Sequence, residues 1–100
     1  YLLQGGAPNP KDPYSGPGYD LPPEFNDLHH TKGVIGMARV PDVANPERSS
    51  HGSQFHILLA DNPQMDGQHT IFGECMTNCE LLRDVKKGDQ IEDIRVYVRK

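Results

Sequence analysis

Two stretches set polar side chains inside what otherwise reads as buried strand. They are Ser53-Gln54-Phe55-His56-Ile57 and Met65-Asp66-Gly67-Gln68-His69-Thr70-Ile71-Phe72-Gly73. Side chains alternate faces along a strand, so Gln54, His56 and Leu58 point one way, opposite to Phe55, Ile57 and Leu59. One face then builds a core, while the other could line an apolar pocket with a few hydrogen-bonding groups, suited to a small ligand or a peptide. The alternative is a solvated strand face, and this strand alone does not decide between the two.

Other chemistries find little support in the residues. Ser53 lies near His56, but the Gly-x-Ser-x-Gly turn of a hydrolase nucleophile is not present in the sequence. The sequence therefore argues against hydrolysis. We also expect no metal and no cofactor, because the spacing of the histidines matches no metal-binding signature. These histidines are His29, His30, His51, His56 and His69.

Cys75 and Cys79 are the two cysteines of the chain. Structural zinc needs about four ligands, and no second cysteine pair exists. We therefore expect both side chains to be buried, reduced thiols, with a redox or metal role as the less favoured alternative. Reduced thiols would slightly favour a reducing, cytoplasmic compartment, although the sequence leaves the compartment undetermined.

Composition limits the class of protein. The chain has 100 residues, of which 35% are hydrophobic and 24% charged, and its formal net charge is −4. This acidic balance argues against nucleic-acid binding through a basic surface. No apolar run approaches the ~20 residues that a membrane-spanning helix needs. The chain is therefore expected to form one globular unit, or part of one, without a membrane span.

Alternating apolar residues and turn signals predict a mainly β chain with five strands. A helix is also predicted, because Thr77 and Glu80 fit a capping box and Gly88 suits a left-handed C-terminal cap. Its apolar stripe would consist of Leu81, Leu82 and Val85, and a weaker helical turn is expected over residues 23–28. The five expected strands are residues 1–4, 34–38, 54–59, 70–75 and 91–98.

Six sequence blocks, read in order, resemble the cyclophilin family of peptidyl-prolyl cis-trans isomerases. They are Leu3-Gln4-Gly5-Gly6; Gly16-Pro17-Gly18-Tyr19 with Glu24-Phe25 and His30; Gly33-Val34-Ile35-Gly36-Met37-Ala38-Arg39; Gly52-Ser53-Gln54-Phe55; Asp66-Gly67; and His69-Thr70-Ile71-Phe72-Gly73. The resemblance implies an antiparallel β-barrel with capping helices.

The same resemblance aligns Tyr1 well inside the family's domain. Residues 1–100 would then be a partial domain, and the N-terminal strands, a helix and the family's catalytic arginine are expected upstream of Tyr1. Unpaired strand edges would remain in such a piece, so we expect it not to fold well alone. The complement could come from upstream on the same polypeptide, from a cleaved segment that stays bound, or from a larger complex.

The activity implied by the resemblance is cis-trans isomerisation of Xaa-Pro bonds in unfolded or flexible protein clients, which assists their folding and needs no cofactor. An alternative is a non-catalytic module that binds proline peptides, or serves a structural role, within a larger assembly. A truncated product without stable function is a third, weaker alternative.

The resemblance also implies a set of site residues, among which Gln4, Gln54 and His69 would be catalytic and the others would bind substrate. Gln4 and the backbone of Arg39 would hold the carbonyl and amide groups of the peptide, and Gln54 would stand beside the pocket. The family usually has phenylalanine at the position of His56, so this pocket floor is expected to be more polar. Gln64 stands where cyclosporin-sensitive members carry tryptophan, so we expect weak cyclosporin binding. The proline pocket would be lined by Tyr1, Leu2, Met37, Ala38, Phe55, His56, Met65 and His69.

Overall fold

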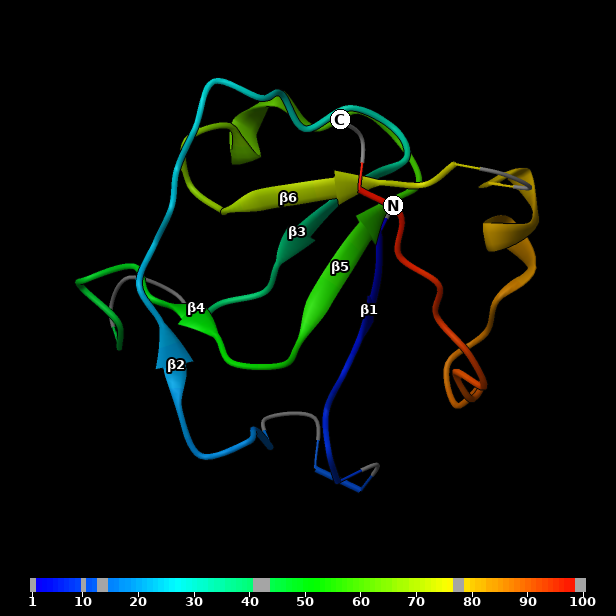
Figure 1. Ribbon diagram of the computed structural model, residues 1–100, viewed down its shortest axis with the longest axis horizontal. Coiled ribbons are helices and arrows are strands. Elements are labelled where there is room, and N and C mark those ends of the chain that lie inside the picture. The colour runs from blue at the N-terminus through cyan, green and yellow to red at the C-terminus, as the bar shows by residue number, and fades with distance from the viewer. Residues whose placement is uncertain (1, 10, 13–14, 41–43, 77–78, 99–100) are drawn as a thin grey trace.

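The computed structural model describes residues 2–9, 11–12, 15–40, 44–76 and 79–98, and most of its regular structure is strand (Figure 1). A four-stranded antiparallel sheet has the spatial order β1-β5-β3-β6. Its strands are β1 (Leu2–Gly5), β3 (Val34–Met37), β5 (Phe55–Leu58) and β6 (Ile71–Glu74). The mainly β class predicted from the sequence is confirmed, and four of the five expected strands lie within two residues of their predicted bounds.

A second small sheet and two short helices complete the described fold. Strands β2 (Asp20–Leu21) and β4 (Ser50–His51) pair antiparallel in a second, two-stranded sheet that the sequence did not reveal. Two short 3-10 helices, η1 (Pro63–Met65) and η2 (Cys79–Asp84), follow β5 and β6 respectively. Within the described ranges, no helix is long and apolar enough to cross a membrane.

Strand β5 is the centre of the interior, because β1 pairs with one of its edges and β3 with the other. Its buried face carries Gln54, His56 and Leu58, whose exposed fractions are only 4%, 2% and 1%. Phe55 and Ile57 on the opposite face are half-buried. The solvated-face alternative for Gln54 and His56 is therefore wrong. His56 of β5 and Gln54, the residue before it, are polar residues of the interior.

Gly36 makes room for one of these polar side chains. It stands directly opposite His56 in the β3–β5 pair. A Cβ atom added at position 36 would lie 2.8 Å from His56 Nε2 and 3.1 Å from the carbonyl oxygen of Thr70. The pairing of β3 with β6 shifts register between Ile35 and Gly36, as a β-bulge does. The imidazole thus occupies space that any larger residue at position 36 would fill.

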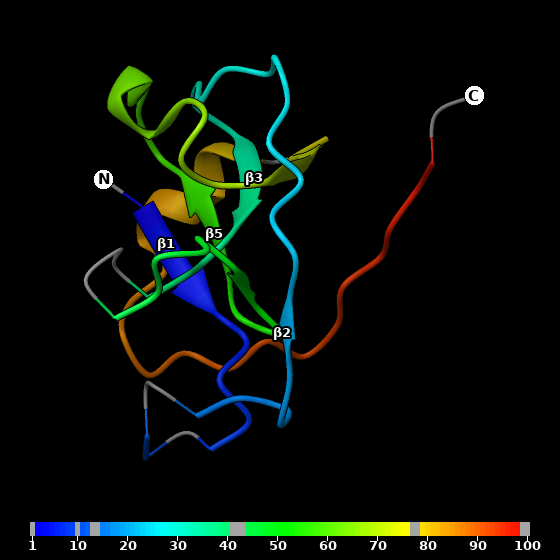
Figure 2. The ribbon, with the colours of Figure 1, turned by 90° about the vertical axis from the view of Figure 1, so that its left-hand side faces the viewer.

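The predicted fifth strand, residues 91–98, is wrong. This segment has no regular secondary structure, and Ile94, Val96 and Val98 are 58%, 81% and 83% exposed. Figure 2 shows it in orange to red, running away from the sheet. Alternating apolar residues form a strand only when another strand accepts their backbone hydrogen bonds, and none of the described strands does so here.

The helix predicted after β6 is only partly right. In its place η2 covers the six residues Cys79–Asp84, and the proposed cap Thr77 lies outside the described residues. Gly88 does adopt the expected positive φ, +97°. Leu81 is 58% exposed, so the apolar stripe has little to pack against. Residues 23–28 form no helical turn.

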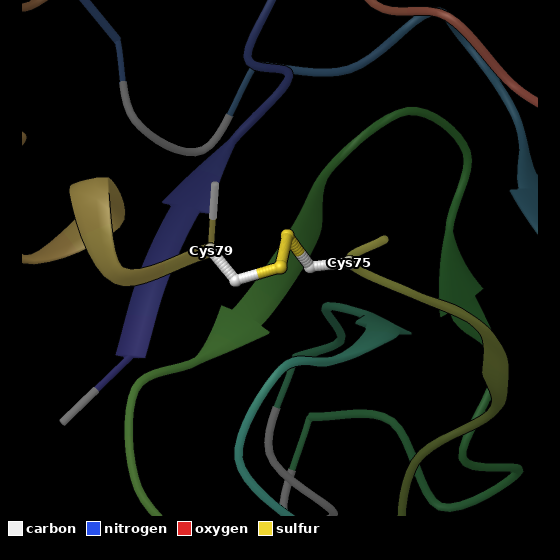
Figure 3. The surroundings of a disulfide bond; sticks show 2 residues. All are labelled: Cys75 and Cys79. Carbon is white, nitrogen blue, oxygen red and sulfur yellow. A yellow bond between two sulfur atoms is a disulfide. The ribbon is translucent and has the colours of Figure 1, made fainter. Parts of the chain in front are cut away.

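Cys75 and Cys79 form a disulfide bond, which corrects the expectation of reduced thiols (Figure 3). Their Cα atoms lie 6.0 Å apart, within the range that a disulfide spans. The backbone N–H of Cys75 donates to the carbonyl of Gly33, which fixes this end of β6 beside β3. The disulfide therefore attaches the start of η2 to the main sheet. The preference for a reducing compartment depended on reduced thiols and loses its basis.

Candidate functional site

A chain of amide side chains joins β1 to the residue before β5. Gln4 Nε2 donates to Gln54 Oε1 at 2.8 Å, and Gln54 Nε2 donates to the carbonyl oxygen of Ser15 at 2.9 Å. Gln4 is exposed, whereas Gln54 is buried. The oxygen and the nitrogen of the Gln54 amide each have a partner, so Gln54 holds the Gln4 amide in one orientation. The second N–H of Gln4 is therefore oriented at the surface of the sheet. Such an oriented donor can hold a peptide carbonyl.

His51 supports this amide chain from the side. Its Nδ1 accepts the backbone N–H groups of Ser53 and Gln54 at 3.2 and 3.0 Å, and its Nε2 lies 3.4 Å from Gln54 Nε2. Two backbone donors on Nδ1 require that this nitrogen carry no hydrogen. The turn before β5 is therefore fixed by a histidine to which sequence reasoning gave no role.

Three histidine rings lie together under the sheet. The ring centroids of His56 and His69 are 5.3 Å apart, and those of His30 lie 6.0 Å from His56 and 6.1 Å from His69. His30 Nε2 and His56 Nε2 are buried without a hydrogen-bond partner. Burial, followed by the neighbouring rings of His69 and His30, lowers the pKa of His56 to about 4. His56 is therefore a neutral side chain at physiological pH.

His69 is oriented by β3. Its Nδ1 lies 3.2 Å from the carbonyl oxygen of Met37, which can only accept, so this nitrogen carries the hydrogen. The preceding residue, Gln68, accepts at its carbonyl oxygen from Arg39 Nε at 2.5 Å. These contacts place the His69 ring next to the backbone of Met37. The side chain of Arg39 thus donates to a backbone carbonyl of the same chain.

Asp66 connects the cluster to the loop before β3. Its Oδ1 accepts from the backbone N–H of His30 at 2.6 Å and lies 3.0 Å from His30 Nδ1, and its Oδ2 lies 2.8 Å from His29 Nδ1. These bonds, first that of the His29 side chain and then that of the His30 backbone, lower the pKa of Asp66 to about 2. Sequence reasoning gave Asp66 no role, although its place between Met65 and His69 was a usable signal.

The structure brings most of the predicted site residues together around β5. Gln4 stands opposite His56 in the β1–β5 register, and Met37 stands opposite Phe55 in the β3–β5 register. Leu2, Met37, Phe55, Met65 and His69 are half-buried. Met37 and Phe55 lie on the face of the sheet opposite to Gln4 and His56.

Two predicted residues are more buried than the prediction implied, and a third cannot be compared. His56 is 2% exposed and belongs to the interior rather than to an accessible surface. Ala38 is buried and acts through its backbone, whose N–H donates to Gln54 and whose carbonyl accepts from His51. Tyr1 lies outside the described residues.

Two surface cavities lie beside β2 and β4 instead of at the predicted proline pocket. Their volumes are about 180 and 350 Å³, and neither is lined by a predicted pocket residue. Asp20, Val40 and His51 line both. No group of three or more histidine, cysteine or acidic side chains in the described part of the chain is placed to hold a metal ion.

Comparison with known proteins explains why these residues occur together. Residues 1–99 match the family model of the cyclophilin type peptidyl-prolyl cis-trans isomerase. The chain belongs to the cyclophilin family. It is 34% identical over 98 residues to a peptidyl-prolyl cis-trans isomerase of Synechococcus elongatus, covering 96% of this chain and 63% of that protein. It is 31% identical to peptidyl-prolyl cis-trans isomerase B of Bacillus subtilis, covering 96% and 64%.

A solved structure shares the fold of this cyclophilin chain. The cyclophilin type peptidyl-prolyl cis-trans isomerase of Cryptosporidium parvum superposes with a TM-score of 0.72 at 25% identity, covering 92% of this chain and 57% of that one. A second structure of the same protein was determined in the presence of the dipeptide Ala-Pro, with a TM-score of 0.71. The chain thus spans less than two thirds of the length of these relatives.

Proposed function

We propose that the natural polypeptide carrying this chain catalyses cis-trans isomerisation of Xaa-Pro bonds in protein clients. The observation that carries the proposal is the oriented amide of Gln4, held by Gln54 on the face of the sheet that also carries His56. The presence of Ala-Pro with the Cryptosporidium parvum relative supports proline peptides as the ligand class.

Isomerisation of an Xaa-Pro bond requires little of the protein beyond selective binding of the twisted amide. An Xaa-Pro bond isomerises slowly because amide resonance must be broken, with a barrier close to the ~18–20 kcal/mol of ordinary peptide bonds. No covalent intermediate is required. A group accelerates the reaction only if it binds the twisted amide more tightly than either planar form.

Each site residue has a distinct part in this proposal. Leu2 shares the face of the sheet that carries Gln4 and His56, so half-buried Leu2 and Met65 would contact the proline ring. Met37 and Phe55 pair on the opposite face and would support the site from behind. Gln4 would donate to the carbonyl of the substrate, and the backbone of Arg39 would hold the peptide beyond it. His69, with its Nδ1–H fixed by Met37, would contact the substrate through the rest of its ring. The family resemblance implies a cationic donor to the proline nitrogen from an arginine upstream of Tyr1.

The proposal is tested on the natural polypeptide by measuring cis-trans exchange of an Ala-Pro-containing peptide by NMR. We expect exchange far above the uncatalysed rate, and roughly ten-fold slower exchange for Gln4→Ala. Gln90→Ala is the matched control, because Gln90 is an exposed glutamine outside the sheet and outside the proposed site. Exchange no faster than in buffer, from a folded protein, would refute the proposal.

The alternative is a proline-peptide binding module without turnover. It is favoured by the fact that the oriented amide of Gln4 and the half-buried apolar residues can bind a peptide, while neither by itself favours the twisted amide. Peptide binding without accelerated exchange in the same experiment would select this alternative. Assistance of client folding belongs to the same proposal, since it requires that flexible chains enter the groove.

A complementing segment or partner is a further part of the proposal. Ile91, Ile94, Val96, Tyr97 and Val98 are between 57% and 83% exposed. Contiguous exposed apolar residues of this kind usually mark a surface that another chain segment covers. We expect the natural polypeptide to protect these residues from hydrogen exchange better than the 100-residue chain alone.

A further inference from the structure

We propose that Asp66 is a positioning residue that acts through His30 on His56 and His69, two residues of the proposed proline site. The proposal rests on the proposed function, because it concerns the shape of that site. Three observations support it: the bonds of the carboxylate, the packing of the three rings, and the attachment of the segment that carries His69.

The carboxylate selects one tautomer of His30. Asp66 Oδ1 lies 3.0 Å from His30 Nδ1 and can only accept from it. The hydrogen of a neutral His30 ring is therefore on Nδ1, and the lone pair is on Nε2. The opposite tautomer would turn the Nδ1 lone pair towards the carboxylate, which is repulsive. A carboxylate that orients a histidine in this way is a common supporting contact in functional sites.

The selected tautomer determines whether the buried Nε2 of His30 carries a lone pair or a hydrogen. The His30 side chain has no exposed surface, and its Nε2 is buried without a partner. Its ring lies about 6 Å from both His56 and His69, centroid to centroid. With Asp66 in place, His30 turns a lone pair and not an N–H group into this space. Loss of the carboxylate would allow an N–H without an acceptor to be buried there.

Asp66 also fixes the segment that carries His69. Its own backbone N–H donates to Pro63 and ends η1, while the N–H of Asn62 donates to the carbonyl of His30 at 2.8 Å. The segment 62–69 is thus attached to His30 at both the start and the end of η1. Met65 and His69 lie one residue before and three residues after the carboxylate. One side chain therefore orients both the His30 ring and the segment facing it.

Asp61 provides a matched comparison within the same region. Its Oδ1 accepts the backbone N–H of Lys32 at 2.8 Å. Both aspartates receive a backbone N–H from the loop before β3, but Asp66 alone of the two also binds imidazole rings. Asp61→Asn and Asp66→Asn remove the same charge and keep one accepting oxygen. The difference between them isolates the action on His30.

The test uses Asp66→Asn and Asp61→Asn in the natural polypeptide, with NMR correlations between ring nitrogens and ring protons as the first readout. We expect hydrogen on Nδ1 of His30 in the wild type and in Asp61→Asn, and a mixture of both tautomers in Asp66→Asn. The second readout is titration with an Ala-Pro peptide. Asp66→Asn should weaken binding about five- to ten-fold more than Asp61→Asn. In a His30→Phe background, Asp66→Asn should weaken binding little further.

Several results would overturn the proposal. They are hydrogen on Nε2 of His30 in the wild type, equal binding by the two asparagine variants, or additive effects of Asp66→Asn and His30→Phe. The wild-type tautomer needs no variant, so it tests the proposal even if Asp66→Asn does not fold. A wild type that binds no proline peptide would refute the proposed function instead. The ring signals of His30, His56 and His69 would then still support or overturn the action of Asp66.

Discussion

The side chains of Gln4 and Gln54 form a hydrogen bond of 2.8 Å although 50 residues separate them in the chain. The bond joins an exposed residue of β1 to a buried residue at the entry to β5, and Gln54 passes the contact on to the carbonyl of Ser15. The long loop that contains Ser15 is thereby attached to the main sheet. The Gln54 amide therefore both orients Gln4 in the proposed site and attaches the Ser15 loop to the sheet.

Gln54→Leu should reduce both stability and peptide affinity. The substitution removes the hydrogen bonds to the Gln4 amide and the Ser15 carbonyl, neither of which is buried, so each lost bond should cost about 0.5–1.5 kcal/mol. Urea unfolding and peptide titration measure the two effects. Gln64→Leu makes the same change on exposed η1 and should alter stability by less than about 0.5 kcal/mol. Equal losses in the two variants would contradict the role of Gln54 as a connecting residue.

Stability should fall as the pH decreases from about 6.5 to about 4. The folded state holds the pKa of His56 at about 4, below the ordinary histidine value of 6.5, so in this window the unfolded chain binds a proton that the folded chain does not. The cost reaches about 3 kcal/mol at the acid end of the window. Asp66 contributes to the pH dependence only at lower pH, because its pKa is lowered from 3.8 to about 2 in the folded state. Its contribution to stability is complete above pH 3.8 and is lost as the pH falls through about 2.

Urea unfolding of the wild type and of His56→Phe at several pH values between 7.5 and 4 measures this dependence. Each protein is its own reference at pH 7.5, so any change in packing caused by the phenylalanine cancels. His56→Phe should lose most of the slope between pH 6.5 and 4. An unchanged slope in the variant would assign the dependence to other groups.

Gly36→Ala should destabilise the protein by about 1–3 kcal/mol, because its Cβ would lie 2.8 Å from His56 Nε2 and the core must shift. Gly73→Ala is the matched control in β6, since the nearest atom to its Cβ, Ile35 Cβ, is 3.9 Å away. Thermal or urea unfolding compares them. Similar stabilities for the two variants would mean that the His56 ring moves aside without cost.

Reduction of the Cys75–Cys79 disulfide should lower stability by about 2 kcal/mol, the chain-entropy value for a loop of this size. Urea unfolding with and without a dithiol reductant measures it. The double variant Cys75→Ser, Cys79→Ser should resemble the reduced protein and should not respond to the reductant. A wild type that is equally stable in both conditions would show that η2 does not depend on this bond.

The sequence alone determined the strands and the family. Apolar alternation is a local property with period two, so β1, β3, β5 and β6 could be located without knowledge of their neighbours. The ordered motifs around Gln4, Met37, Gln54 and His69 then indicated the cyclophilin family and a proline-peptide site. The same pattern failed for residues 91–98, because a strand also needs a partner for its backbone.

Only the tertiary structure decided which face of β5 is interior, since alternation predicts two faces but not the side on which other residues pack. It brought His30, His56 and His69 together from three separate segments and placed Asp66 against His30, contacts between residues that lie up to 39 positions apart. It also joined Cys75 to Cys79, because the path of the chain between them is set by tertiary packing. Local patterns carry no information about such distances, which depend on how the strands pack against one another.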